Sequence, residues 1–363
     1  MKISWRSKAL FCVVVFLFGC VMFMRYLYHS PVVPLDSKSS PFHQTHTHHM
    51  SHSDTPSPSL APYSVKEITC SGNKTEVIPS HLSPSYQDFL RYRNCRAYPI
   101  LLTPLPCEDD LYLLLAVKST ALHAERRAAV RDTWGQAGDI QGRRIKLVFL
   151  MGRSEDQVQG QSLQPLLQQE SLLYGDILQW DFMDRFYNLT WKEIGFLSWF
   201  SRTCSSAQFV FKGDSDVFVN TGNLIEFLTA HKPVNHLFVG YIHSPEPPIR
   251  DRGSKYFVPV EVHPAKLYPS FPSGGGYLMS RQTMLGLDVA AQKVELFPLD
   301  DVFLGLCLEH MGVKLIHHKG FLTFGMRDDL SDPCVYREIM LVHPRKPVEM
   351  RVMWLLVQNI AGE

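Results

Sequence analysis

The 363-residue sequence contains no C-x-x-C pair, no stripe of basic residues and only one long uncharged hydrophobic run. The missing C-x-x-C pair argues against a zinc ribbon or a thioredoxin-like redox centre. The 36 basic residues nearly balance the 35 acidic ones, at a formal net charge of +1. We therefore expect no nucleic-acid partner, because proteins that bind nucleic acid gather basic residues on one surface.

The hydrophobic run at residues 9–24 predicts the compartment of the protein. Lys2, Arg6 and Lys8 precede it, and aromatic residues typical of a membrane interface follow it. No small-x-small cleavage site follows, so we expect a retained signal anchor rather than a removed signal peptide. By the positive-inside rule, residues 1–8 form a cytosolic tail, residues 9–28 form a transmembrane helix, and the rest of the chain is luminal.

The luminal part begins with a segment that shows no hydrophobic periodicity. Residues 29–69 are rich in Pro, Ser, Thr and His, which predicts a flexible stem ahead of a folded domain at residues 70–363. Six cysteines lie beyond the predicted membrane span, and an even number in an oxidising lumen suggests three disulfides among fifteen possible pairings. Two glycosylation sequons, at Asn73 and Asn188, agree with luminal exposure.

From about residue 110 the sequence alternates between strand-like and helix-like segments. Continuous apolar runs predict buried strands, and the segments between them have lengths typical of helices. The predicted order is strand 111–117, helix 125–134, strand 145–151, helix 155–173, strand 177–180, helix 189–200 and a fourth strand from residue 209. This alternation predicts a mostly parallel sheet with helices on both faces. Ligands of such sheets bind beyond the C-terminal ends of the strands.

A pair of carboxylates follows the fourth predicted strand. Asp214 and Asp216 flank Ser215, and residues two apart in extended backbone point the same way. Such a pair can share Mg²⁺ or Mn²⁺ and leave coordination positions for phosphate oxygens. A turn with solvated carboxylates is the alternative, because a D-x-D triplet is common. The position directly after a buried strand favours the metal interpretation.

Three later features add candidate site residues. A triple glycine at 274–276 allows the backbone to approach a ligand closely, and a flexible loop is the alternative. Asp300 and Asp301 open a predicted helix, where they serve either as helix-start residues or, beside a sugar pocket, as a source of a general base. His317 and His318 follow a short strand, and either could complete a metal site, although a lone histidine there is more often structural.

Four motifs, in order and at family-like spacing, make the sequence resemble the β1,3-glycosyltransferase family of the Golgi from about residue 86 onward. They are Arg126-Arg127 with Arg131 and Thr133-Trp134-Gly135, Gly213-Asp214-Ser215-Asp216-Val217-Phe218, Gly274-Gly275-Gly276, and Asp300-Asp301-Val302 with Gly305. Further segments resemble the β1,3-N-acetylglucosaminyltransferase branch: Gly175-Asp176-Ile177-Leu178, Asn188-Leu189-Thr190, His318-Lys319-Gly320-Phe321 and Leu341-Val342-His343.

The resemblance implies a Rossmann-like α/β domain of GT-A type behind the transmembrane helix and stem, held in the Golgi membrane as a single-pass type II protein. It implies a metal-dependent, inverting transfer of GlcNAc from UDP-GlcNAc to the 3-hydroxyl of a terminal galactose on a glycoprotein or glycolipid glycan. Family members often form homodimers. A β1,3-galactosyltransferase and a non-catalytic luminal UDP- or glycan-binding relative are the alternatives.

The resemblance also implies roles for individual residues. Asp216 becomes the principal ligand of Mn²⁺ or Mg²⁺, Asp214 lies near the ribose and metal-bound water, and His318 is a further metal-site candidate. Asp301 becomes the general base, with Asp300 as its neighbour.

For the remaining motifs the resemblance implies that Gly274, Gly275 and Gly276 line the sugar and acceptor pocket, and that Arg126 and Arg127 either contact the nucleotide or only hold the first helix. Many relatives have a third Asp where this chain has Ser215. Because the middle residue of an extended triplet points away from its neighbours, we expect metal binding to survive this difference. The implied disulfides are Cys70–Cys95, Cys107–Cys204 and Cys307–Cys334.

Overall fold

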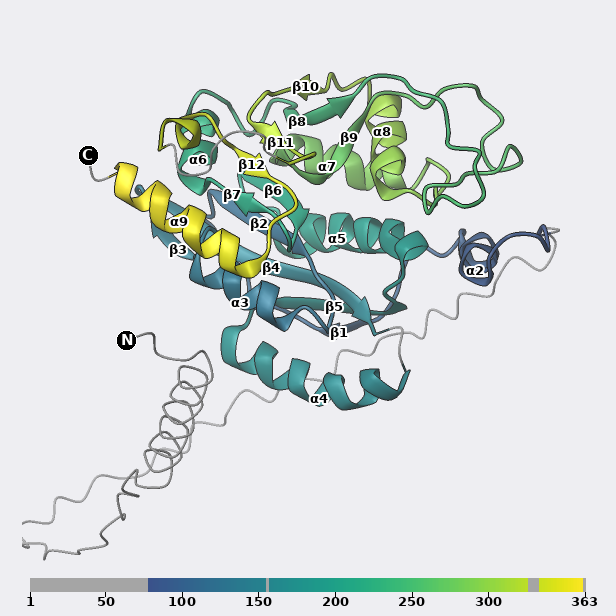
Figure 1. The fold of residues 1–363 in the computed structure, drawn as a ribbon, viewed down its shortest axis with the longest axis horizontal. Coiled ribbons are helices and arrows are strands. Elements are labelled where there is room, and N and C mark those ends of the chain that lie inside the picture. The colour runs from purple at the N-terminus through teal and green to yellow at the C-terminus, as the bar shows by residue number, and fades with distance from the viewer. Residues whose placement is uncertain (1–77, 155–156, 326–332, 362–363) are drawn as a thin grey trace, which may run out of the picture. The chain divides into compact units, whose positions relative to one another are not determined.

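The computed structural model describes residues 78–154, 157–325 and 333–361 (Figure 1). The predicted tail, transmembrane helix and stem lie outside this part of the chain. Within it, no helix combines the length and the apolar character needed to cross a membrane. The described residues form a mixed nine-stranded sheet in the order β1-β5-β4-β2-β6-β9-β8-β10, with β3 paired to β4, and a three-stranded sheet in the order β11-β12-β7.

The elements of the large sheet and its helices follow the predicted alternation. The strands are β1 (Ile100–Leu102), β2 (Leu113–Lys118), β3 (Gly138–Ile140), β4 (Arg143–Arg153), β5 (Ile177–Met183), β6 (Phe209–Asp214), β7 (Phe218–Val219), β8 (Phe238–His243), β9 (Phe271–Ser280), β10 (Ile316–His317), β11 (Phe321–Leu322) and β12 (Leu341–Val342). The α-helices are α2 (Pro84–Tyr92), α3 (Ala124–Asp132), α4 (Gln157–Tyr174), α5 (Leu189–Thr203), α6 (Thr221–Thr229), α7 (Arg281–Ala291), α8 (Asp300–Met311) and α9 (Pro347–Ala361). Two 3₁₀ turns, η1 (Phe186–Asn188) and η2 (Pro333–Arg337), complete the set.

The four strands predicted from apolar runs lie side by side and in parallel, as β5, β4, β2 and β6. Alternate side chains of β2 enter two different cores, because successive residues of a strand point to opposite faces. Leu114 and Ala116 pack in the core formed with α2, α5, α7 and α8, whereas Leu113 and Leu115 pack in the core formed with α3, α6 and α9. The predicted α/β layers are therefore confirmed for this half of the sheet.

The other half of the sheet is not purely parallel. Strand β9 runs antiparallel to both β6 and β8, and β10 runs parallel to β8. The C-terminal ends of β2, β6, β8 and β10 therefore share one edge of the sheet with the N-terminal end of β9. We call this the C-terminal edge. It carries Lys118, Asp214, Phe271, His243 and His317.

Cysteine pairing agrees with the resemblance at one bridge and differs at another. Cys107 is bonded to Cys204, across 97 residues of sequence. Cys95 is also in a disulfide, and its expected partner, Cys70, lies outside the described residues. The implied Cys307–Cys334 bridge is not formed, because Cys307 is a buried thiol on α8 within one core, whereas η2, which carries Cys334, packs through Tyr336 against the other core.

The sequon at Asn188 is a structural feature of this fold rather than an exposed acceptor. Asn188 is 5% exposed, and its Nδ2 donates to the Met183 carbonyl at 2.7 Å. Thr190 is fully buried, and its hydroxyl donates to the Phe297 carbonyl at 2.6 Å. In the folded domain Asn188 is therefore not accessible as a glycosylation acceptor. The residues of the sequon instead fix the start of α5 against the segment that leads into α8.

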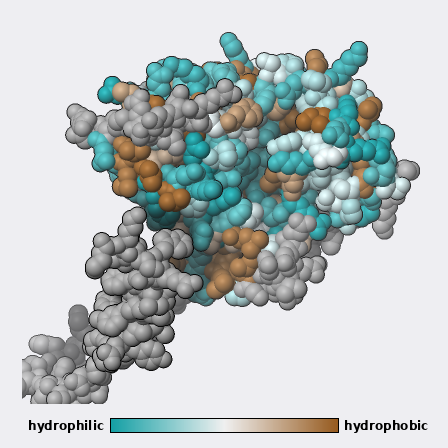
Figure 2. Space-filling view, viewed as in Figure 1, coloured by the Kyte–Doolittle hydropathy of each residue, from teal (hydrophilic) through white to brown (hydrophobic). Residues whose placement is uncertain are grey.

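Hydrophobic side chains reach the surface over two helices. Val348, Val352 and Leu355 are exposed along α9, where Figure 2 shows a hydrophobic patch at the left of the view. A second set, Leu166, Leu172 and Leu173, is exposed on α4. Both helices pack through other residues, such as Met350 and Leu167, onto the same face of the sheet.

Candidate functional site

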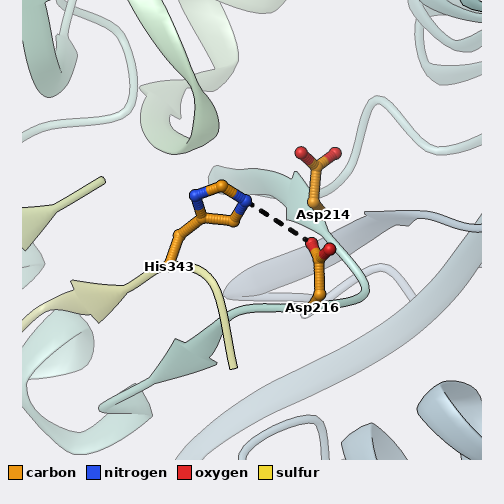
Figure 3. Close-up of side chains that lie close together, drawn as sticks. All are labelled: Asp214, Asp216 and His343. Carbon is orange, nitrogen blue, oxygen red and sulfur yellow. Dashed lines mark ion pairs between the residues drawn. The ribbon is translucent and has the colours of Figure 1, made fainter. Parts of the chain in front are cut away.

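Two carboxylates and one imidazole meet where β6 ends (Figure 3). Asp214 is the last residue of β6, and Ser215 and Asp216 form the turn that follows. Asp214, Asp216 and His343 each offer one ligand atom, and these atoms all lie within 4.8 Å of one another. Hard divalent cations such as Mg²⁺ and Mn²⁺ prefer carboxylate oxygens, so the two carboxylates fit the predicted metal, and the imidazole offers a nitrogen ligand beside them.

The histidine of this group is held in one orientation. Its Nδ1 lies 3.0 Å from the Thr323 carbonyl oxygen, which can only accept a hydrogen bond. Nδ1 therefore carries a proton, and in the neutral imidazole the lone pair is on Nε2. Nε2 faces Asp216 Oδ1 at 3.8 Å. A backbone carbonyl that fixes the tautomer in this way is a common support for a metal-binding histidine.

His318 does not belong to this group, which corrects the predicted set of metal ligands. Its Nδ1 accepts a hydrogen bond from the Gly320 backbone N–H at 3.1 Å, and its ring packs edge-on against Phe227 and Phe321. His343 instead lies beside the two carboxylates. The sequence had offered a signal for it, since the segment at 341–343 is one of those that resemble the family.

Lys118 is a site residue that the sequence analysis missed. Its Nζ lies 3.1 Å from Asp214 Oδ1 and 3.2 Å from Asp300 Oδ2, so that it joins the two acidic motifs. Burial alone would lower the pKa of Lys118, but the surrounding carboxylates hold it well above its usual value, and the side chain remains charged. A charged residue directly after a buried strand is the same signal that had identified Asp214.

Asp300 and Asp301 open α8 but differ in their surroundings. Burial opposes the charge on Asp300, yet the Lys118 ammonium lowers its pKa below the usual value. Asp301 Oδ1 is buried and has no hydrogen-bond partner among the described residues. Burial and the neighbouring Asp300 carboxylate hold the pKa of Asp301 well above its usual range. An unpartnered carboxylate with a raised pKa has the properties of a general base.

The triple glycine lies in β9 rather than in a flexible loop. The β8–β9 register pairs Gly240 with Tyr277 and then Ile242 with Pro272. Tyr241 alone therefore faces the four residues 273–276, which form a bulge in β9. Bulges of this kind occur beside active sites, where they redirect the chain.

Each of the first two glycines makes room for a site residue. A Cβ on Gly274 would lie 2.8 Å from Asp301 Oδ2, and a Cβ on Gly275 would lie 3.2 Å from the His343 Cβ. Gly276 has a φ of 155°, which side chains rarely allow. The glycines thus let the carboxylate and the imidazole approach the strand backbone.

The two predicted arginines have different places. Arg126 donates from NH1 to Asp216 Oδ2 at 3.0 Å and faces the site. Arg127 is 1% exposed and pairs with Glu170 of α4 at 2.6 Å, so it holds α3 and cannot reach a nucleotide. Of the two interpretations for this motif, the structural one holds for Arg127.

A cavity of about 230 Å³ opens beside the carboxylate pair, between the ends of β2 and β6 and the helices α3 and α5. We call it the donor-side cavity. Its lining includes four cationic side chains, from Lys118, Arg126, Arg185 and Lys192, and three carboxylates, from Asp184, Asp214 and Asp216. A cavity with this many cations beside a potential metal site suits a polyanionic ligand such as a diphosphate.

Comparison with known proteins gives consistent matches. The family model described as Galactosyltransferase matches residues 125–319. Mouse "N-acetyllactosaminide beta-1,3-N-acetylglucosaminyltransferase 4" is 45% identical over 80% of this chain and 83% of its own length. Rat "UDP-GlcNAc:betaGal beta-1,3-N-acetylglucosaminyltransferase 7" is 44% identical over 77% and 72%. Mouse "Acetylgalactosaminyl-O-glycosyl-glycoprotein beta-1,3-N-acetylglucosaminyltransferase" is 45% identical over 76% and 73%.

Proposed function

This chain belongs to the galactosyltransferase family, and we propose that it is a metal-dependent, inverting β1,3-N-acetylglucosaminyltransferase. It transfers GlcNAc from UDP-GlcNAc to the 3-hydroxyl of a terminal galactose on a glycan. The single observation that carries the proposal is the buried Asp301 Oδ1, which has no hydrogen-bond partner among the described residues and follows Asp300, the residue that Lys118 joins to Asp214 of the Asp-Asp-His group. The names of the three relatives support GlcNAc as the transferred sugar.

In this proposal Asp214, Asp216 and His343 would hold Mn²⁺ or Mg²⁺, and the bound cation would supply positive charge next to the UDP leaving group. Arg126 balances the charge of Asp216 and faces the same cavity, where it can also contact a phosphate. Lys118 holds the Asp214 carboxylate in place through an ion pair. Ser215 lines the cavity between Asp214 and Asp216. A serine at this position leaves both neighbouring carboxylates available.

Asp301 accepts the proton of the acceptor 3-hydroxyl while that oxygen attacks the anomeric carbon of the sugar. Attack from the face opposite UDP converts an α-linked donor into a β1,3 linkage in one displacement, without a covalent enzyme intermediate. Lys118 keeps Asp300 charged, and the charge of Asp300 raises the pKa of Asp301, so the base binds its proton more readily. Gly274 provides the space in which the Asp301 carboxylate lies.

The finer assignments of fold and location belong to the same proposal. We assign the folded domain at residues 70–363 to the GT-A type and place it in the Golgi lumen, behind the anchor predicted at 9–28. The acceptor glycan is carried by a glycoprotein or a glycolipid. A homodimer is expected by analogy with the family.

The test is a transfer assay with the full-length chain, Mn²⁺, and either UDP-GlcNAc or UDP-galactose, on galactose-terminated and GlcNAc-terminated acceptors. Product linkage is read by mass spectrometry and NMR. GlcNAc linked β1,3 to galactose is the expected product. Galactose transfer would instead support the second candidate, a β1,3-galactosyltransferase, which the description of the matched family favours. UDP–Mn²⁺ binding without any transfer would support a non-catalytic relative.

A further inference from the structure

Three polar side chains are buried in the core beneath the C-terminal edge, and the function proposed above gives them no role. Lys212 of β6 pairs through Nζ with Glu193 Oε2 of α5, and it donates to the Tyr277 hydroxyl of β9 at 3.1 Å. Lys212 and Glu193 are 1% exposed, and Tyr277 is 2% exposed. None of the three lines the donor-side cavity or belongs to the metal group. We call them the buried triad.

Stability of the fold does not by itself account for the buried triad. A buried ion pair gives up its hydration, and well-packed apolar side chains of similar volume are often at least as stabilising. The next residues on the same face of the two strands, Val210 and Met279, are apolar members of one core. Apolar residues would therefore suit the positions of Lys212 and Tyr277 as well, and the charged pair calls for another explanation.

The strand register places the buried triad next to the carboxylates of the site. Lys212 and Asp214 are two residues apart in β6, so their side chains leave the same face of the sheet about 7 Å apart along the strand. Asp214 pairs there with Lys118, which also contacts Asp300 at the start of α8. Lys212 therefore lies one layer of side chains below the Lys118–Asp214 pair.

Tyr277 connects the buried triad to the backbone that borders the base. It is the first residue after the bulge at 273–276, and its ring stacks on Phe238 with the centroids 5.1 Å apart. Three residues earlier in the same strand, Gly274 borders the Asp301 carboxylate. A tyrosine held by its ring and by its hydroxyl thus fixes where the bulge ends.

The charges around the base point to the same connection. The charged or titratable groups that face Asp301 come from four elements: Asp300 on α8, Lys118 on β2, Asp214 and Lys212 on β6, and Tyr277 on β9. Burial and the Asp300 carboxylate raise the pKa of Asp301, and the two ammonium groups oppose that rise. Burial and the nearby carboxylates, Glu193 first, hold the pKa of Tyr277 well above its usual value, so this residue remains a neutral phenol.

We propose that the buried triad positions the general base: it anchors the end of the bulge against which Asp301 lies, and it holds the Lys212 ammonium on the side of the carboxylates. Glu193 keeps that ammonium in place from α5, and Tyr277 does so from β9. The three are positioning residues, since they act through Asp301. This inference rests on the proposed function, because it takes Asp301 as the base that accepts the acceptor proton.

The experiment measures the pH dependence of kcat/KM for transfer by the full-length chain. The double variant Lys212→Met with Glu193→Gln removes both charges together, so that no unpaired charge stays buried. Loss of the cation raises the pKa of Asp301 further. The pH below which kcat/KM falls is therefore expected to rise by about one unit, while the KM for UDP-GlcNAc stays within about twofold. Lys212→Arg, which keeps the cation, is expected to leave that pH unchanged.

The matched control is the double variant Arg127→Met with Glu170→Gln, which removes a buried ion pair between α3 and α4. Its melting temperature is expected to fall, but its pH dependence is expected to equal that of the unchanged chain. If the Lys212–Glu193 variant does not fold, Tyr277→Phe provides the second test, because it removes only a hydroxyl. This variant is expected to lower kcat by about fivefold at constant KM for UDP-GlcNAc, and an unchanged kcat would overturn the proposal.

An unchanged pH dependence in the Lys212–Glu193 variant, or a loss of activity that is equal at every pH, would also overturn the proposal. Failure of the proposed function has a different signature, namely no transfer by the unchanged chain. In that case carbon-13 NMR of the aspartate carboxyls follows the titration of Asp301 directly, with its signal assigned by its absence in Asp301→Asn. A higher titration midpoint in the Lys212–Glu193 variant would support the role of the triad, and an equal midpoint would refute it.

Discussion

The donor-side cavity and the buried triad each place a lysine beside a carboxylate, but the cavity is open to a ligand, whereas the triad is enclosed in the core. On the donor side, Lys118 and Arg126 make ion pairs with Asp214 and Asp216, and the distances between their atoms are fixed near 3 Å. In the triad, the side chains of Lys212 and Glu193 are each 1% exposed.

This difference between the two regions follows from the ligands and groups proposed for them. A diphosphate and a divalent cation carry the same charges in every reaction of this type, so the residues around them are constrained together. The acceptors in the proposed reaction are neutral glycans. Their reacting hydroxyl gives its proton to Asp301, the group on which the triad acts. Changes on the donor side are therefore expected to alter ligand binding, and changes near the base to alter the rate and its pH dependence.

The largest effect is expected from Asp301→Asn. The amide keeps the shape of the side chain but cannot accept the hydroxyl proton, so kcat should fall by about 10³-fold while UDP–Mn²⁺ binding is unchanged. Glu309→Gln, at the exposed far end of α8, is the matched control. Near-normal transfer by Asp301→Asn would assign the base elsewhere.

The pH dependence of the unchanged enzyme follows from the same group. Transfer requires the charged form of Asp301, and its pKa is raised above the ordinary range of an aspartate, about 4. As pH falls, Asp301 is therefore protonated early, and kcat/KM should drop by about tenfold for each unit below that raised pKa. The residual activity of Asp301→Asn should lack this acid limb. If kcat/KM of the variant still falls at low pH, a group other than Asp301 causes the fall.

The rate of transfer should also depend on the glycine at position 274, next to Asp301. In Gly274→Ala the new methyl group would lie 2.8 Å from Asp301 Oδ2 and displace the carboxylate. We expect kcat to fall by about 10²-fold, with the melting temperature little changed. Gly222→Ala, where the nearest atoms lie 3.4 Å away, is the control. Equal activity of the two variants would show that the bulge does not set the geometry of the base.

Substitution of each histidine distinguishes the metal site predicted with His318 from the Asp-Asp-His group that contains His343. His343→Ala should weaken Mn²⁺ affinity, measured by calorimetry with UDP present, by on the order of 100-fold. His318→Ala should change it by less than about twofold, since its ring faces Phe227 and Phe321. The reverse result would restore His318 to the metal site.

The smallest effect is expected from salt. Raising the ionic strength screens the cations of the donor-side cavity and should raise the KM for UDP-GlcNAc by about threefold. The pH below which kcat/KM falls should stay constant, because the Lys212–Glu193 pair is buried and salt screens buried charges much less. A shift of that pH with salt would contradict the contrast drawn between the two regions.

The sequence by itself determined the four parallel strands β5, β4, β2 and β6, the helices between them and the two acidic motifs. Continuous apolar runs such as 111–117 and 145–151 must be buried, and alternation with helices leads to parallel pairing. Asp214 and Asp216 could be recognised because a D-x-D pair after a buried strand is a local pattern. Asp300 and Asp301 could be recognised because both lie at a helix start.

Only the tertiary structure decided which distant residues meet. The ion pair between Lys118 and Asp300 joins positions 182 residues apart, and the metal group takes His343 rather than His318. These outcomes depend on strand order, since β9 inserts between β6 and β8 and brings Gly274 against Asp301. Burial likewise decided that Asn188 supports α5 and that Cys307 remains a thiol. Side-chain contacts across a sheet have no counterpart in local sequence, because they arise only when separate segments pack together.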